Sequence, residues 1–225
     1  MLPDYWLQRP HIEYDSQARA NFDQLFARAK AAGINNPIDY TLPIPKWQFL
    51  CYLADREDIV FHGTGEPNIQ VFEPRLSNDL NAFGAQTAVY AAGDALWAMF
   101  FAILDRSHYA MTTSNACIQL VDESGQVSEP RYVFSISQPS LRHQPWRTGM
   151  VYLLPRDTFV NQPSLRFGPY EVRVPQLASL VPVKPIARLE VAPEDFPFLR
   201  DIRGIDDARL VEYGQAMQTG APWPE

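Results

Sequence analysis

The chain has 225 residues, 46% of them apolar and 20% charged, so it can bury about 70% of its unfolded surface in a core of its own. Its formal net charge of −7 disfavours a nucleic acid partner, because neutralising phosphates needs clustered Lys and Arg, and no such cluster appears. The longest apolar run, Ala95–Leu104, is too short to span a bilayer, and the N-terminus lacks the pattern of a signal peptide. We therefore expect a soluble, cytoplasmic protein with no membrane partner.

The first quarter of the chain is predicted to be helical. Ser16–Ala32 carries apolar residues at helical spacing, with its first residue as the N-cap, and stops at Gly33. A proline-bounded linker leads to a second helix over 46–58. We expect residues 1–57 to form a helical appendage that packs on an α+β domain over 58–225.

From Ile59 onward the pattern is typical of β-strands. One apolar helix is expected over 95–106 with Asp94 as its N-cap, and short helices are expected over 193–202 and 205–217. This order of elements favours the α+β class over alternating β-α units. Seven runs rich in β-branched and aromatic residues are predicted as strands, at 59–62, 87–92, 116–122, 131–137, 150–155, 170–174 and 183–191.

His62 stands directly after the first of these strands and is followed by Gly63, Thr64 and a second glycine. Bare backbone beside a polar side chain permits the close approach of a ligand, although a histidine at a strand end also serves as a simple loop cap. The sequence holds no G-x-S-x-G, P-loop or dinucleotide-binding motif. The four histidines are scattered, and Cys51 and Cys117 have no ligand spacing, so we expect no metal site and two structural thiols.

Three segments in order resemble the catalytic core of the ADP-ribosyltransferase superfamily, in particular the branch of diphtheria toxin and the poly-ADP-ribose polymerases. They are "FHGT" at Phe61–Thr64, "VYAAGD" at Val89–Asp94 before a helix, and "YEVRV" at Tyr170–Val174. The resemblance covers residues 59–191. It implies a split antiparallel β-sheet, and an enzyme that cleaves the nicotinamide–ribose bond of NAD and transfers ADP-ribose to an unknown acceptor or to water.

The resemblance also implies roles for single residues. His62 would bind the adenosine ribose of NAD, and Gly63, with Thr64 beside it, would grip the nicotinamide carboxamide. Tyr90 would stack on the nicotinamide ring. Glu171 would stabilise the positive charge that develops at the ribose as nicotinamide leaves. From the residues alone, Tyr90 is equally a core residue of a strand and Glu171 the solvent-facing position of another.

Arg75 lies in the loop region after the histidine strand, where its guanidinium could clamp the pyrophosphate of NAD. An ion pair with Glu73 or Asp79 is the alternative. The chain also departs from the family: Ala98 stands where the helix often has a polar residue, and no acidic side chain lies two positions before Glu171, which disfavours an arginine acceptor.

Two further functions stay open. An NAD-dependent RNA 2′-phosphotransferase of the same superfamily would need Arg75, Arg142 and Arg147 to hold the RNA phosphate. The net acidic charge disfavours this activity. The other function is that of a non-catalytic, toxin-associated or binding module, which would hold NAD or ADP-ribose without releasing nicotinamide.

Overall fold

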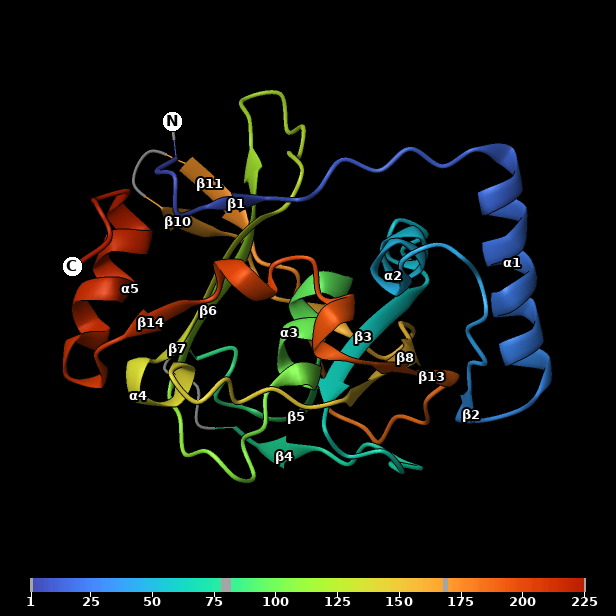
Figure 1. Cartoon of the computed structure of the whole chain (residues 1–225). Helices are drawn as coiled ribbons and strands as arrows, with labels where there is room; N and C mark the ends of the chain where they lie inside the picture. The colour runs from blue at the N-terminus through green and yellow to red at the C-terminus, as the bar shows by residue number, and fades with distance from the viewer. Residues whose placement is uncertain (1, 78–81, 168–169, 225) are drawn as a thin grey trace.

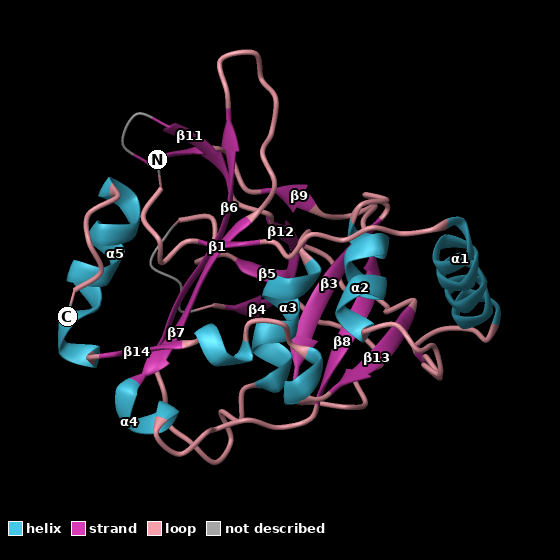
Figure 2. Cartoon of the chain, turned by 45° about the horizontal axis from the view of Figure 1, so that its top comes forward, coloured by secondary structure: helices cyan, strands magenta, loops and turns pink. Residues whose placement is uncertain are grey.

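Two mostly antiparallel β-sheets and the helices between and around them make up the chain in a computed structural model that describes residues 2–77, 82–167 and 170–224 (Figure 1). The predicted α+β class is confirmed. Helices α1 and α5 lie at opposite ends of the molecule in both views, and α3 lies near its middle (Figure 2).

The first sheet has six strands in the order β1-β7-β6-β11-β10, with β14 added parallel to β7. β6 and β7 pair antiparallel at its centre. The strands are β1 (Leu7–Gln8), β6 (Thr113–Val121), β7 (Arg131–Ser137), β10 (Leu165–Phe167), β11 (Tyr170–Arg173) and β14 (Arg203–Ile205).

The second sheet has eight strands in the order β2-β13-β8-β3-β5-β12-β9, with β4 paired to β5. Its central strands carry the histidine and the tyrosine that the sequence singles out. The strands are β2 (Asn36–Pro37), β3 (Ile59–Thr64), β4 (Arg75–Leu76), β5 (Thr87–Ala92), β8 (Gly149–Pro155), β9 (Val160–Asn161), β12 (Gln176–Ser179) and β13 (Ala187–Val191).

The helices follow the predicted order with different ends. Asp15, not Ser16, is the N-cap of the first helix, because the Asp15 carboxylate accepts from the backbone N–H of Ala18. The helical bounds are α1 (Ser16–Ala31), α2 (Lys46–Ala54), α3 (Ala95–Ile103), α4 (Gln138–Leu141) and α5 (Leu210–Thr219), with 3₁₀ turns at Pro193–Asp195, Leu199–Asp201 and Asp207–Arg209.

The largest hydrophobic cluster surrounds α3. Seven of the nine residues of α3 are buried, and they contact apolar side chains from both sheets. Asp94 caps α3 as expected, since its carboxylate accepts from the backbone N–H of Trp97. In the described part of the chain no helix is both long enough and apolar enough to cross a membrane.

Residues 1–57 are integrated into this architecture more closely than an appendage would be. They supply β1 to the six-stranded sheet and β2 to the eight-stranded sheet. Phe22 of α1 and Phe49 of α2 are fully buried in the cluster around α3. The predicted boundary near residue 58 therefore marks a change in the local pattern, whereas the core runs across it.

Candidate functional site

The eight-stranded sheet is split between β3 and β5. Both strands have six residues, yet they pair at a single position, Phe61 with Ala92. On its other side β3 pairs with β8 along its whole length. The split therefore begins after Phe61, where the "FHGT" segment continues without β5 as a partner.

His62 bridges this split. Its Nδ1 lies 2.7 Å from the Tyr90 carbonyl oxygen of β5, and because a carbonyl only accepts, Nδ1 donates. In the neutral ring Nε2 then carries the lone pair, and no residue of the described chain hydrogen-bonds to it. Burial lowers the pKa of His62, while the bond to Tyr90 acts in the opposite direction. The half-buried imidazole is thus a neutral hydrogen-bond acceptor at the split.

The His62 ring lies on the outer face of the sheet, opposite the cluster around α3. His62 alternates with Phe61, which packs in the cluster around α3, so the imidazole points to the opposite face. There the ring of Phe72 lies 4.7 Å from the His62 ring, between centroids. Phe72 in turn contacts Tyr152, whose hydroxyl donates to the Glu66 carbonyl. These contacts hold the segment after β3 over the histidine.

Arg75 lies close enough to His62 to depress its pKa further. It is exposed and sits on β4, which pairs with β5. No ion pair joins Arg75 to Glu73 or to any other residue of the described ranges, and Asp79 lies outside them. The structure thus places the Arg75 guanidinium near the histidine, and its role in clamping a pyrophosphate stays a prediction.

Tyr90 and Thr64 make contacts that stabilise turns. The Tyr90 hydroxyl donates to the carbonyl oxygens of Phe83 and Gln86 and accepts from the Gln86 N–H, so it holds the turn that precedes its own strand. The Thr64 hydroxyl accepts from the Glu66 N–H. A stacking role for the Tyr90 ring stays a prediction.

The two glycines allow close packing at the end of β3, and a role of Gly63 in holding nicotinamide stays a prediction. A Cβ on Gly63 would lie 1.7 Å from the Ala98 carbonyl oxygen, so the missing side chain lets α3 pack directly on β3. A Cβ on Gly65 would lie 1.7 Å from the guanidinium carbon of Arg147. Ala98, which stands where the family often has a polar residue, is therefore in contact with Gly63, but as a packing partner.

Glu171 is not brought to the histidine strand. It lies on β11 in the six-stranded sheet, opposite Val121 of β6 and Arg166 of β10. It is exposed, as the solvent-facing position of a strand would be. The strand that neighbours Tyr90 is instead β12, where Ala178 stands opposite the tyrosine. The expectation that Glu171 serves the same site as His62 has no support from the sheet order.

No protein-family model, curated protein or solved structure matches the chain. The functional argument therefore rests on the geometry of the site itself.

Arg147, which the sequence offers only as one of three arginines for an RNA phosphate, packs against the loop after β3. Its guanidinium covers Gly65, and its Nε is buried without a hydrogen-bond partner in the described chain. It ends the basic stretch "SLRHQPWR", and nothing in that local pattern indicates contact with the end of β3. Arg142, from the same stretch, is exposed.

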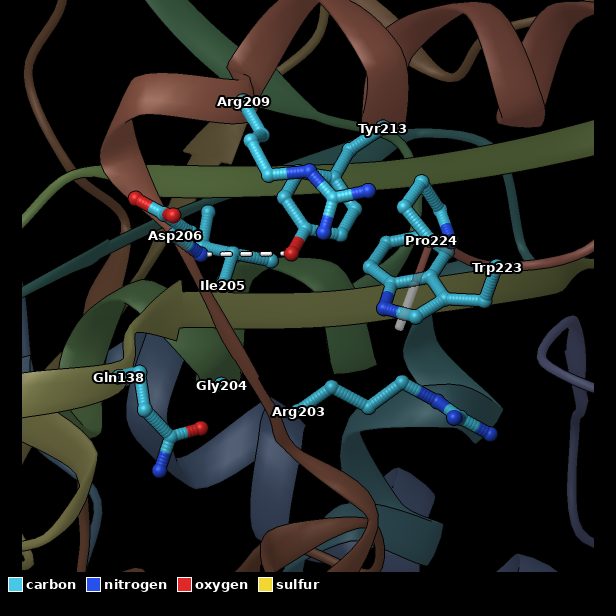
Figure 3. Close-up of a pocket in the computed structure, with 9 residues that line it drawn as sticks. All are labelled: Gln138, Arg203, Gly204, Ile205, Asp206, Arg209, Tyr213, Trp223 and Pro224. Carbon is cyan, nitrogen blue, oxygen red and sulfur yellow. Dashed lines mark hydrogen bonds between the residues drawn. The ribbon is translucent and has the colours of Figure 1, made fainter.

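A separate hollow lies between β14 and α5, and three of its polar side chains are already paired (Figure 3). Tyr213 accepts from the backbone N–H of Asp206, and Arg209 pairs with Glu212. The Trp223 ring packs 4.9 Å from that of Tyr213, between centroids. These contacts attach the C-terminal segment to the rest of the chain, which is enough to explain why these residues gather at the hollow. Among the described residues no group of three or more His, Cys, Asp or Glu side chains is placed to hold a metal.

Proposed function

We propose that this protein is a binding domain for NAD or ADP-ribose, which holds the ADP-ribose part of the ligand at the split between β3 and β5. The observation that carries the proposal is the hydrogen bond from His62 Nδ1 to the Tyr90 carbonyl. That bond fixes the tautomer and leaves Nε2 as an acceptor for a ribose hydroxyl. Arg75, with no ion pair in the described chain, supplies the charge for a pyrophosphate.

The resemblance to ADP-ribosyltransferases supports the choice of ligand, and the position of the carboxylate limits the chemistry. Departure of nicotinamide leaves an oxocarbenium-like centre that a nearby carboxylate must stabilise. Glu171 lies on β11 in the other sheet, and α3 packs against Gly63. We therefore propose binding without Glu171-dependent nicotinamide release.

The test is a titration of the purified chain with NAD, ADP-ribose and nicotinamide, followed by ligand-observed NMR. We expect NAD and ADP-ribose to bind within about threefold of each other and nicotinamide alone not to bind, because the nicotinamide end has no dedicated contact. His62→Ala and Arg75→Gln should each weaken binding about tenfold, the loss of one charge-assisted or buried hydrogen bond. Arg142→Gln, an exposed arginine away from the split, is the matched control.

Glu171→Gln separates the binding domain from the transferase. We expect it to bind NAD like the wild type, and we expect no free nicotinamide from either protein. Nicotinamide release by the wild type that Glu171→Gln abolishes would contradict the proposal and restore the transferase. If neither NAD nor ADP-ribose binds the wild type, the proposed ligand is wrong.

A further inference from the structure

A cleft of about 710 Å³ opens at the start of β3, at the other end of the strand from the split. Its volume falls in the range of small-molecule sites, and Ile59 in its wall lies three residues, or about 10 Å along the strand, from His62. Both sheets contribute to its walls, with α2 at its rim. Its lining includes Ile59, Gln119, Arg156, Gln162, Arg173 and Leu177.

Gln162 is a lining residue of the cleft, and one of its polar atoms has no partner among the described residues. The residue is only 8% exposed, and its amide oxygen Oε1 is buried without a hydrogen-bond partner in the described chain. A buried polar atom without a partner costs free energy that a ligand recovers by supplying one. The side chain therefore indicates a ligand that carries a hydrogen-bond donor.

Two arginines border the same cleft without an acidic partner. Arg156 donates from Nη2 to the Asn161 amide oxygen at 2.8 Å, and no ion pair in the described ranges involves it. Arg173 on β11 is exposed and likewise has no ion pair within those ranges. Because they come from different sheets, an anion with several oxygens can be held by both.

The lining also holds three acidic residues, and two of them are engaged by other groups. Asp55 pairs with Arg9 at 2.9 Å. Asp94 accepts from the Trp97 N–H and the Tyr132 hydroxyl. Glu57 is exposed at the rim, so two arginines stand against one carboxylate among the lining residues that have neither an ion pair nor a capping hydrogen bond in the described chain.

Apolar side chains complete the lining. Ile59 and Leu177 line the cleft, and both are almost fully buried. They form an apolar wall against which a flat or aliphatic group of a ligand can pack. We propose that this cleft is a second binding site, for a small phosphorylated molecule that also carries a hydrogen-bond donor. A nucleoside monophosphate has the size, the phosphate and the donor.

The experiment is isothermal titration of the whole chain with AMP, adenosine and inorganic phosphate. AMP should bind at least tenfold more tightly than either part, because only AMP reaches both the arginines and Gln162. Arg173→Gln should weaken AMP binding about tenfold, and since Arg173 is exposed this change spares the fold. Arg142→Gln serves as the charge-matched control and should not change AMP affinity.

Gln162→Leu supplies a second, independent variant. It removes the unsatisfied oxygen, so it should weaken AMP binding several-fold while leaving the affinity for inorganic phosphate unchanged. The proposal is overturned if AMP does not bind, or if it binds with wild-type affinity to both Arg173→Gln and Gln162→Leu. Loss of NAD binding in His62→Ala and loss of AMP binding in Arg173→Gln are separate readouts, so either site can fail alone.

Discussion

The His62 imidazole titrates differently in the folded and the unfolded chain. Burial lowers its pKa below the ordinary histidine value of 6.5, so between the two pKa values the unfolded chain binds more protons and stability rises with pH. The contribution is therefore fully present above about pH 6.5 and is lost as the pH falls toward the folded pKa. His62→Gln keeps a donor for the Tyr90 carbonyl and removes the titration.

We expect the urea midpoint of the wild type to fall more steeply than that of His62→Gln between about pH 7.5 and pH 5.5. The two proteins differ only at position 62, so the difference between their slopes belongs to that residue. Equal slopes would show that His62 keeps an ordinary pKa in the folded chain.

Asp94 is a buried carboxylate with two hydrogen-bonding tasks. It caps α3 through the Trp97 N–H and accepts from the Tyr132 hydroxyl, both at 2.8 Å, and its burial raises its pKa. Asp94→Ala removes the cap and leaves a buried hydroxyl unpaired, so we expect a loss of about 2–4 kcal/mol in unfolding free energy.

Asp94→Asn keeps an acceptor for the cap and can donate to the Tyr132 oxygen. We expect it to cost less than about 1 kcal/mol, since asparagine is also a good N-cap and carries no charge to bury. Urea denaturation of both variants measures the difference. Equal losses for the two would mean that the negative charge, and not the hydrogen bonds, stabilises the site.

At the scale of elements, Gly63 sets how closely α3 approaches β3. Gly63→Ala places a methyl group 1.7 Å from the Ala98 carbonyl oxygen, so strand and helix must separate. We expect a destabilisation of about 1–3 kcal/mol. Gly214, inside α5, meets no atom within 4 Å, and Gly214→Ala should instead stabilise the chain by about 0.5–1 kcal/mol. Thermal unfolding of both variants is the test, and a neutral Gly63→Ala would mean that α3 yields easily.

The local sequence pattern predicted those strands whose own residues favour a β-strand. The limits of β5 and β7 match the predicted runs because alternating β-branched and aromatic residues specify a pleated surface. β12 was missed, since Gln176–Ser179 directly follows Pro175 and has little β-branched content. The place of Glu171 could not be predicted for another reason: its strand was predicted, but which sheet that strand joins depends on long-range pairing.

For the whole molecule, the N-terminal quarter belongs to the core. Phe22 and Phe49 are fully buried beside α3, and Lys46 pairs with Asp195 at 2.9 Å. A chain that begins at residue 58 would expose that apolar surface and lose both β1 and β2. We expect it not to unfold cooperatively, as measured by near-UV circular dichroism and thermal melting. A cooperative transition near the wild-type temperature would show that 58–225 is an autonomous domain.

The pairing of β1 with β7 sets an order of events during synthesis. Leu7 pairs with Tyr132, which leaves the ribosome 125 residues later, on the order of 10 s at about 5–20 residues per second. Tyr5 waits longer still, because its hydroxyl donates to the carbonyls of Ala216 and Ala221. Throughout that interval Tyr5 and Trp6, both almost fully buried at the end, have no core to enter. We therefore expect the nascent chain to expose these two aromatic side chains until α5 emerges.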